Sequence, residues 1–589
     1  MSRISASALC WRGALAAAVA TCLAGAAWVP EAQAVKPNPS LKWSTAKAFD
    51  VSKPLRELPA QARAASQQDA NAVYEVRPER GPVVTDMGHT GDGALQGDTL
   101  SRLLPPGPPP SRGAEQANFE GISNQDNFNL FGFRVNPPDP VGDVGPRHYV
   151  QMVNLAVAVY DKTGTRLVGP VAIGSLWAGF AVEDCTDPSG DPIVVYDQLV
   201  GRWILSQFTT RGEPYYYNCV AISKTGDPTG EYYRYAFQTQ PDTVDGGYFF
   251  PDYPKYGVWT DSYILTTRDF GNGLGPVEYG ISVYALEKAQ MISGNPKARA
   301  VQFFLDSGIV PLNQIGDGLL PADIDGHRRP QDGAPIPIVG TQDDNASYGA
   351  TFDALNIWEL SIKWKATPEA SLVLASQLPV AAFDSIFPCA PTSRDCLPQP
   401  GVAPAQYLDI LSYRQRPTWR LAYRNFGGYE ALVTSQSVEA LPGVAGMRWY
   451  EIRRVDGAYS IYQQGTYAPN DGVHRWMGSA AMDSLGNIAM GYSVVNGVDV
   501  FPGIRYTGRI ASDPLGAMTQ PEGTIVAGTG VQTTTNSRWG DYTSLNVDPT
   551  DDCTFWYTNE YYTAAGQASS AAGWQTRIAS FRLPGCGKD

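Results

Sequence analysis

The stretch GDPIVVYDQLVGRWILSQF (190–208) contains two runs of apolar, β-branched and aromatic residues, joined by a polar turn. Such runs around a Gly-marked turn predict two antiparallel strands. Three further stretches have the same order of strand, tight turn and strand: FPDYPKYGVWTDSYILTTRDF (250–270), HRWMGSAAMDSLGNIAMGYSV (474–494) and RWGDYTSLNVDPTDDCTFWYTNEY (538–561). The recurrence of this unit from about residue 138 to the end predicts an all-β chain folded as a β-propeller.

The spacing of these units predicts the number of blades. Candidate blades begin near positions 138, 190, 249, 319, 418, 473 and 537. A four-stranded blade needs about 40 to 50 residues, so the longer intervals predict insertions, chiefly over 366–417. We predict seven four-stranded blades, with six or eight as alternatives. We expect FNLFGF (128–133) to pair with RIASFRL (577–583), because closing the ring removes exposed strand edges.

The N-terminal region predicts export. Arg3 and Arg12 precede an apolar stretch from Gly13 to Trp28, and Ala32-Gln33-Ala34 then gives the small-residue pattern of signal cleavage. Residues 1–34 are therefore predicted to be a signal peptide of a secreted or periplasmic protein. The apolar stretch is too short to predict a transmembrane anchor. Lipidation of Cys22 is an alternative, although the residues before it fit a lipoprotein cleavage site poorly.

The rest of the chain divides into two parts. Residues 35–116 are rich in Pro, Ala, Gly and Gln and have no periodicity, which predicts a flexible segment, although a short strand within it could still join the propeller. Residues 117–589 are predicted to form the propeller domain. An even number of cysteines in an exported chain favours disulfides, and the pairs closest in sequence are Cys185 with Cys219, Cys389 with Cys396, and Cys553 with Cys586.

Composition restricts the partners. A net charge of −14 disfavours nucleic acid, because attraction to phosphates dominates that kind of binding. The chain has 14 Trp and 31 Tyr, which suit stacking on a polysaccharide or glycan but also pack blades together. The sequence contains no signal for an oligomeric state.

Some of the turns resemble the Asp-box hairpins of sialidase-like propellers. The three matching stretches are VYDKTGTRLVGP (159–170), VYDQLVGRWILSQF (195–208) and AMDSLGNIAMGYS (481–493). In those families the aspartate accepts backbone hydrogen bonds in its own turn, so the resemblance implies a structural role for Asp161, Asp197 and Asp483. The whole mature chain also resembles a group of secreted bacterial propeller proteins, through PPDPVGDVGPRHYVQ (137–151), YQQGTYAPNDGVHRWMGS (462–479) and RWGDYTSLNVDP (538–549). That resemblance implies the fold and export, and no activity.

In a propeller, residues at the start of each innermost strand converge at one end of the central channel. Polar residues near the predicted starts are Asp139, Asp143, Asp187, Asp191, Asp252, Lys255, Asp323, Asp325, Arg420, Arg424, His474, Arg475, Arg538 and Asp541. They are acidic in the first four blades and basic in the last three. A purely structural alternative is that these charges pair with one another and hold neighbouring blades in register.

Glycoside hydrolysis needs two carboxylates, one as proton donor and one as base or nucleophile. We predict Asp252 and Asp541 as this pair, because each precedes an aromatic residue, Tyr253 or Tyr542, that can stack on a sugar. His474 is a further candidate acid or base.

Three arginines, Arg424, Arg475 and Arg538, are predicted to grip an acidic group of the substrate. The nucleophilic Tyr and partner Glu of sialidases are not identifiable, so we predict a glycoside hydrolase or lyase of another kind. The alternatives are a non-catalytic propeller that binds glycans or proteins, and a scaffold for other secreted proteins.

The only cofactor that the sequence suggests is a structural calcium ion. Asp323, Asp325 and the later Asp332 place alternating carboxylates around Gly326, although a full calcium loop would carry further ligands. No Gly-rich phosphate loop and no GxSxG motif is present, so no cofactor is predicted to be required.

Overall fold

The computed structural model describes residues 39–59, 73–75, 90–96, 115–187, 189–212, 215–239, 246–271, 278–387, 395–410 and 415–587. The chain divides into Met1–Pro37 and Asn38–Asp589. The predicted signal peptide lies outside the described residues. Within them, no helix is long and apolar enough to cross a membrane.

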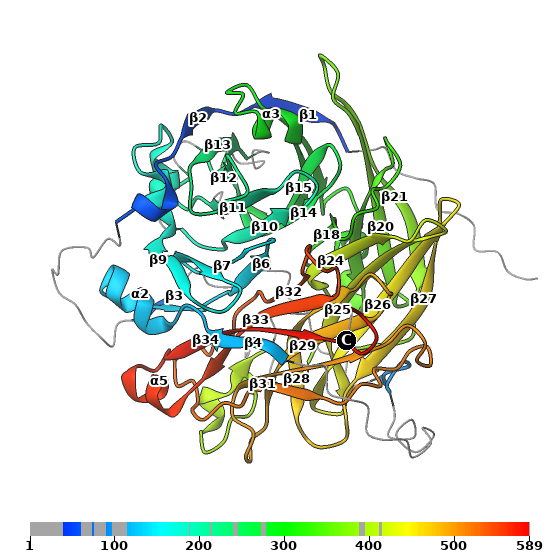
Figure 1. Ribbon diagram of the computed structural model, residues 1–589. Coiled ribbons are helices and arrows are strands. Elements are labelled where there is room, and N and C mark those ends of the chain that lie inside the picture. Colours follow the sequence, from blue (N-terminus) through cyan, green and yellow to red (C-terminus); the bar gives the residue numbers. More distant parts are fainter. Residues whose placement is uncertain are drawn as a thin grey trace, which may run out of the picture. The chain divides into compact units, whose positions relative to one another are not determined.

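Most described strands belong to repeats of four, in which each strand pairs antiparallel with the next one along the chain (Figure 1). The first repeat comprises β6 (Val141–Val144), β7 (His148–Val153), β8 (Ala156–Asp161) and β9 (Arg166–Ala172). The second comprises β10 (Ile193–Asp197), β11 (Arg202–Phe208), β12 (Tyr217–Ser223) and β13 (Tyr232–Gln238). The third comprises β14 (Phe249–Val258), β15 (Ser262–Gly271), β16 (Tyr279–Glu287) and β17 (Arg299–Asp306).

The remaining repeats continue to the C-terminus. The fourth comprises β18 (Leu320–Ile324), β19 (Ile336–Gln342), β20 (Ala354–Lys363) and β21 (Glu369–Pro379). The fifth comprises β24 (Thr418–Asn425), β25 (Glu430–Leu441), β26 (Val444–Val455) and β27 (Ala458–Tyr467). The sixth comprises β28 (His474–Met482), β29 (Ile488–Val495), β30 (Gly503–Arg509) and β31 (Gly523–Val526). The seventh comprises β32 (Ser544–Val547), β33 (Thr554–Tyr562), β34 (Trp574–Arg582) and β4 (Glu115–Glu120).

The first strands of these repeats form a closed ring of contacts, in the order β6, β10, β14, β18, β24, β28, β32 and back to β6. Their first residues lie close to the predicted blade starts. Strands β18 and β24 are also hydrogen-bonded in parallel, which joins the fourth and fifth repeats into one eight-stranded sheet. These first strands are almost entirely buried, which explains their Val, Ile, Leu and Tyr content.

The described parts of residues 35–116 include short strands that join the sheets, as the sequence allowed. Strand β1 (Lys42–Thr45) pairs with β17, and β2 (Ala48–Val51) pairs with β13. Strand β3 (Val73–Glu75) pairs in parallel with β5 (Arg134–Asn136). The outer edges of the second and third sheets offer unpaired backbone groups, and this segment satisfies them despite its low hydrophobicity.

An N-terminal strand completes the last sheet, but it is not the predicted one. Strand β4 pairs with β34, whereas most of the predicted strand 128–133 lies in helix α2 (Asn124–Phe131). The reason is local: Ser123 and Asp126 form a capping box at the start of α2, and Gly132, at φ 77°, ends it.

The remaining elements lie between strands of a repeat, between repeats or in the N-terminal segment. They are η1 (Leu55–Glu57), η2 (Ile173–Trp177), η3 (Glu183–Thr186), α3 (Lys288–Ile292), α4 (Leu312–Ile315), η4 (Ala346–Tyr348), β22 (Asp395–Leu397), η5 (Pro404–Gln406), β23 (Leu408–Asp409) and α5 (Ala564–Ser569). The predicted insertion 366–417 is therefore shorter than expected, because β21 belongs to the fourth repeat.

Two predicted disulfides are present, Cys185–Cys219 and Cys553–Cys586. Cys396 is also disulfide-bonded, and its predicted partner Cys389 lies outside the described residues.

The three turn aspartates have the structural role expected of them. Asp161 accepts backbone hydrogen bonds from Thr163 and Thr165, and Asp483 accepts from the second and fourth residues after it. Asp197 accepts from the Leu199 amide in the same way. These side chains stabilise turns at the ends of strands.

Candidate functional site

The backbone is unusual where the first strands begin. In six of the seven repeats a non-glycine residue at or near this point has a left-handed backbone: Asp139 (φ 47°), Asp191 (43°), Tyr253 (53°), Gln415 (39°), Met477 (46°) and Ser537 (54°). Such a conformation costs about 1–3 kcal/mol per residue and persists only where the surrounding structure enforces it. Strained residues of this kind are concentrated at functional sites.

Asp541, just before β32, is the hub of a buried ionic network. Its side chain is 6% exposed, and its Oδ2 accepts a hydrogen bond of 2.8 Å from Nη2 of Arg538. Its backbone amide donates to Oδ1 of Asp139 at 2.6 Å, which links the first and seventh repeats. Nη2 of Arg416 lies 3.9 Å from its Oδ1. Two arginines therefore lie against the Asp541 carboxyl group, and one of them donates a hydrogen bond to it.

Two tyrosines and a lysine adjoin this network. The hydroxyl of Tyr542 donates to Oδ2 of Asp191 at 3.0 Å, and the rings of Tyr253 and Tyr542 lie 5.2 Å apart. The Nζ atom of Lys255, which is 1% exposed, lies 3.1 Å and 3.4 Å from the centroids of these two rings. The guanidinium of Arg416 lies 3.9 Å from the Tyr253 ring. The aromatic faces stabilise buried cations.

Proton affinities here are strongly perturbed. Burial raises the pKa of Asp191 well above its usual range. The charges of Asp252, Asp139 and Asp541 raise it further. Burial also lowers the pKa of Lys255 well below its usual range. Buried groups whose pKa values move in this way are typical of sites that transfer protons.

Two further carboxyl groups belong to the same network. Burial, followed by the charge of Asp541, raises the pKa of Asp139, whose Oδ2 accepts from Nδ2 of Asn154 at 2.7 Å. Burial raises the pKa of Glu560, whose Oε1 accepts from the Gly540 amide at 2.5 Å. We name the whole group the strand-start cluster; it comprises Asp139, Asp191, Asp252, Tyr253, Lys255, Arg416, Arg538, Asp541, Tyr542 and Glu560.

The structure brings together five of the site residues selected from the sequence: Asp252, Tyr253, Arg538, Asp541 and Tyr542. Asp252 is half-buried in β14, and its charge affects both Asp191 and Tyr542.

Sequence reasoning gave no role to several members of the cluster. It noted Asp139, Asp191 and Lys255 at strand starts without selecting them. Arg416, just before β24, was missed although its position gave a signal. Glu560 offered no such signal, because it lies in β33, the second strand of the seventh repeat, whereas the prediction considered only the starts of first strands.

The other two arginines of the predicted clamp lie elsewhere. Near the end of β24, Arg424 makes two hydrogen bonds to Asp552, of 2.8 and 2.7 Å. Arg475 is fully buried and pairs with Asp471 and Glu522. The three-arginine clamp is therefore wrong, because only Arg538 belongs to the strand-start cluster.

His474 is also remote from the cluster. It is 6% exposed, its Nδ1 accepts from the Ala445 amide at 3.3 Å, and its ring lies 6.1 Å from that of Phe387. Burial, followed by the charge of Arg475, lowers its pKa to about 4. A neutral imidazole that accepts a backbone hydrogen bond has a structural role here, unlike the catalytic one predicted.

The opposite ends of the first strands carry a second group, the strand-end cluster of Asp143, Asp323, Asp325 and Arg420. Arg420 donates to Asp325 twice, at 2.9 and 2.7 Å, and to Asp323 at 2.9 Å. Asp143 accepts from the Tyr196 amide at 2.7 Å, and the cavity among these residues is only about 10 Å³.

This pairing does not fit the calcium site predicted from Asp323, Asp325 and Asp332. The guanidinium of Arg420 already neutralises the first two carboxylates, and Asp332 is exposed. A different carboxylate group, Asp343, Asp344 and Asp353, has oxygen atoms within 4.8 Å of one another. Backbone amides donate to two of these side chains, which accounts for the arrangement without an ion.

Comparison with known proteins gives only distant likenesses. No protein family and no curated protein matches the chain. The structure is similar to an α-L-arabinanase of Penicillium chrysogenum, with 13% identity over 67% of this chain and 96% of that chain, and a TM-score of 0.31. An α-L-arabinofuranosidase of Fusarium graminearum has 11% identity over 67% and 93% of the two chains, and a TM-score of 0.34. A mutant sialidase of Trypanosoma rangeli has 11% identity over 76% and 59%, and a TM-score of 0.29. Likeness at this level carries no conclusion about activity.

Proposed function

We propose that the protein is an exported, seven-bladed β-propeller enzyme that cleaves glycosidic bonds of an extracellular, acidic polysaccharide, as a hydrolase or a lyase. The closed ring of first strands supports the blade count. The signal-like N-terminus and the disulfides support export.

One observation carries the proposed chemistry: a carboxyl group with a raised pKa and a carboxyl group next to two arginines belong to one buried network. Burial raises the pKa of Asp191 well above its usual range, whereas Asp541 accepts a hydrogen bond from Arg538 and lies near Arg416. Glycosidases use such a pair, with a protonated acid for the leaving oxygen and a carboxylate as base or nucleophile. We assign the proton donor to Asp191 and the anionic role to Asp541.

Asp252, the partner carboxylate selected from the sequence, is the alternative to Asp191, because it lies close enough to raise the pKa of Asp191. Tyr253 and Tyr542 would contact the sugar ring, and Arg538 would bind its acidic group. No cofactor enters this scheme.

The test is oligosaccharide release by the purified mature chain from a panel of acidic and neutral polysaccharides, followed by mass spectrometry. A product mass that includes one added water indicates hydrolysis, and one without it indicates elimination. Asp541→Asn and Asp191→Asn should each lower the rate at least about 100-fold. Asp332→Asn, an identical change at an exposed aspartate, should leave it unchanged.

Two outcomes would contradict the proposal. Activity that survives both cluster substitutions would place the chemistry elsewhere. Binding of a polysaccharide without release of any product would favour the non-catalytic glycan-binding propeller.

A further inference from the structure

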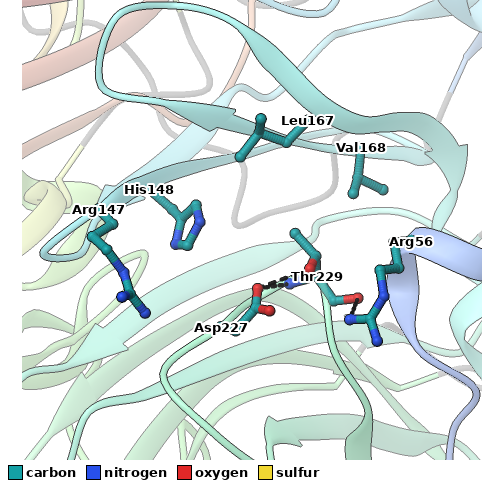
Figure 2. Close-up of a pocket in the computed structure, with 7 residues that line it drawn as sticks. All are labelled: Arg56, Arg147, His148, Leu167, Val168, Asp227 and Thr229. Atoms are coloured by element: carbon teal, nitrogen blue, oxygen red, sulfur yellow. Dashed lines mark hydrogen bonds between the residues drawn. The ribbon is translucent and has the colours of Figure 1, made fainter.

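A separate groove lies between the first two repeats and the N-terminal segment (Figure 2). Its volume is about 370 Å³, which is within the range of small-ligand sites. Its lining residues are Arg56, Arg147, His148, Leu167, Val168, Asp227 and Thr229.

The groove is assembled from segments far apart in sequence. Arg56 comes from η1, which is attached to the β12–β13 turn by the hydrogen bonds from Leu55 N to Gly230 O and from Arg56 N to Thr229 O, of 2.9 and 3.0 Å. Arg147 precedes β7, and Leu167 lies near the start of β9. The groove therefore exists only when the N-terminal segment is bound to the second repeat.

This groove is remote from the strand-start cluster. The β6–β7, β8–β9 and β12–β13 turns that line it all lie on the side of the ring where β6 and β10 end. The strand-start cluster lies where those strands begin. A ligand in the groove would therefore not occupy the catalytic groups proposed above.

The cationic side chains of the groove have N–H groups that are not used in described hydrogen bonds. Among the described residues, Arg147 makes no hydrogen bond or ion pair, and neither does the ring of His148. Arg56 uses only Nη1, which donates to the Thr229 carbonyl at 3.4 Å. Figure 2 shows Arg147 and His148 at one end of the groove and Arg56 at the other.

The middle of the groove offers an acceptor. Oδ1 of Asp227 accepts from the amide and the hydroxyl of Thr229, at 2.9 and 2.8 Å, and its Oδ2 has no described donor. Although burial opposes it, these hydrogen bonds lower the pKa of Asp227, so it is ionised at neutral pH. Leu167, 46% exposed, and Val168 form the facing wall (Figure 2).

We propose that this groove is an accessory binding site for an acidic sugar chain, in which anionic groups bind Arg147 and Arg56 and a hydroxyl between them donates to Asp227. The Asp227 carboxylate repels a small inorganic anion but accepts a hydrogen bond from a sugar hydroxyl, and the aliphatic wall suits the C–H face of a pyranose. On a chain of net charge −14, such a site also gives an acidic polymer one local point of attraction.

The test measures binding by calorimetry in an Asp541→Asn background, so that no turnover interferes. The probes are tetragalacturonate for carboxylates, a sulfated carrageenan tetrasaccharide for sulfate esters, neutral arabinotetraose, inorganic sulfate and hexaglutamate. One or both acidic sugars should bind, and neutral arabinotetraose should not compete. Arg147→Gln and Arg56→Gln should each raise the dissociation constant at least tenfold.

Arg329→Gln is the matched control for Arg56. Like Arg56, Arg329 is exposed and its side chain donates one 3.4 Å hydrogen bond to a backbone carbonyl, that of Leu199. Arg329→Gln should therefore leave the dissociation constant of the acidic sugar unchanged. Asp227→Asn removes the carboxylate that repels small anions, so this variant should bind inorganic sulfate. An unfolded variant would not gain this binding. The proposal is overturned if no acidic sugar binds, if binding is indifferent to Arg147 and Arg56, or if hexaglutamate binds more tightly than either sugar. Arg147 and Arg56 lie outside the strand-start cluster, so their effect on binding can be measured whether or not the catalytic proposal holds.

Discussion

The two ends of the first strands carry charged clusters of opposite character. At the strand-end cluster, Arg420 pairs with Asp323 and Asp325 at hydrogen-bond distance, around a cavity of about 10 Å³. Burial raises the pKa of acids in both clusters, Asp143 and Asp323 in one and Asp139 and Asp191 in the other. The clusters differ in their backbone, which is left-handed at Asp139 and Asp191 of the strand-start cluster. The same strands thus end in satisfied ion pairs but begin in strain and unbalanced charge. That difference separates a structural cluster from a candidate catalytic one.

The largest effect should come from removing the cation of the strand-end cluster. Arg420→Met leaves the two buried carboxylates of Asp323 and Asp325 without their partner, and we expect it to lower the free energy of unfolding by about 3–5 kcal/mol at pH 7. Urea denaturation measures this loss, with Arg329→Gln as the control. A loss below about 1 kcal/mol would mean that the two clusters do not differ in the way described.

The next effect compares the same substitution at the two clusters. Asp325→Asn weakens the two-pronged pair with Arg420 and should cost about 2–3 kcal/mol at pH 7. Asp191→Asn should cost less than about 1 kcal/mol of unfolding free energy, because it removes no ion pair and burial raises the pKa of Asp191, so the charge that it removes is one that the site disfavours. Equal losses in the same denaturation experiment would contradict the comparison.

Dependence on pH gives a smaller effect with a definite sign. The pKa of Asp191 is raised in the folded protein, so its stabilising contribution is complete below the unfolded value of about 4 and is lost as pH rises through the folded value. Asn cannot titrate. The stability of Asp191→Asn relative to the parent should therefore increase with pH, by up to about 1.4 kcal/mol per unit across that window. Asp332→Asn should show no such trend.

The smallest effect concerns His474. His474→Gln weakens one hydrogen bond to the Ala445 amide and should cost about 1 kcal/mol of stability. Oligosaccharide release should stay within about twofold, a change of under 0.5 kcal/mol in the barrier. A much larger loss of activity in the folded variant would return His474 to the list of catalytic candidates.

Local patterns in the sequence predicted much of the fold. Strand–turn–strand units marked the positions of the first strands, and two cysteine pairs were identified from proximity alone. The closing strand was misplaced because an aromatic run, 128–133, resembles a strand, whereas the capping box of Ser123 and Asp126 had already started a helix. The role of β1 and β2 was missed because their partners are edge strands more than 180 residues away in sequence.

The candidate site was predicted in part, for a geometric reason. Strand-start position correctly brought together Asp252, Arg538 and Asp541. The same reasoning wrongly included Asp323, which lies near the end of β18, and Arg420, whose side chain pairs with Asp323 and Asp325.

The sequence by itself determined an all-β chain of recurring antiparallel units, with turn aspartates and neighbouring cysteine pairs, because these depend on contacts within one repeat. Only the tertiary structure decided which charges meet. Asp139 and Asp541 are 402 positions apart, yet they share a hydrogen bond because the ring closes the first repeat against the last. The raised pKa of Asp191, the pairing of Arg420 and the groove at Arg147 likewise arise from burial and from neighbours in other repeats, which no local pattern encodes.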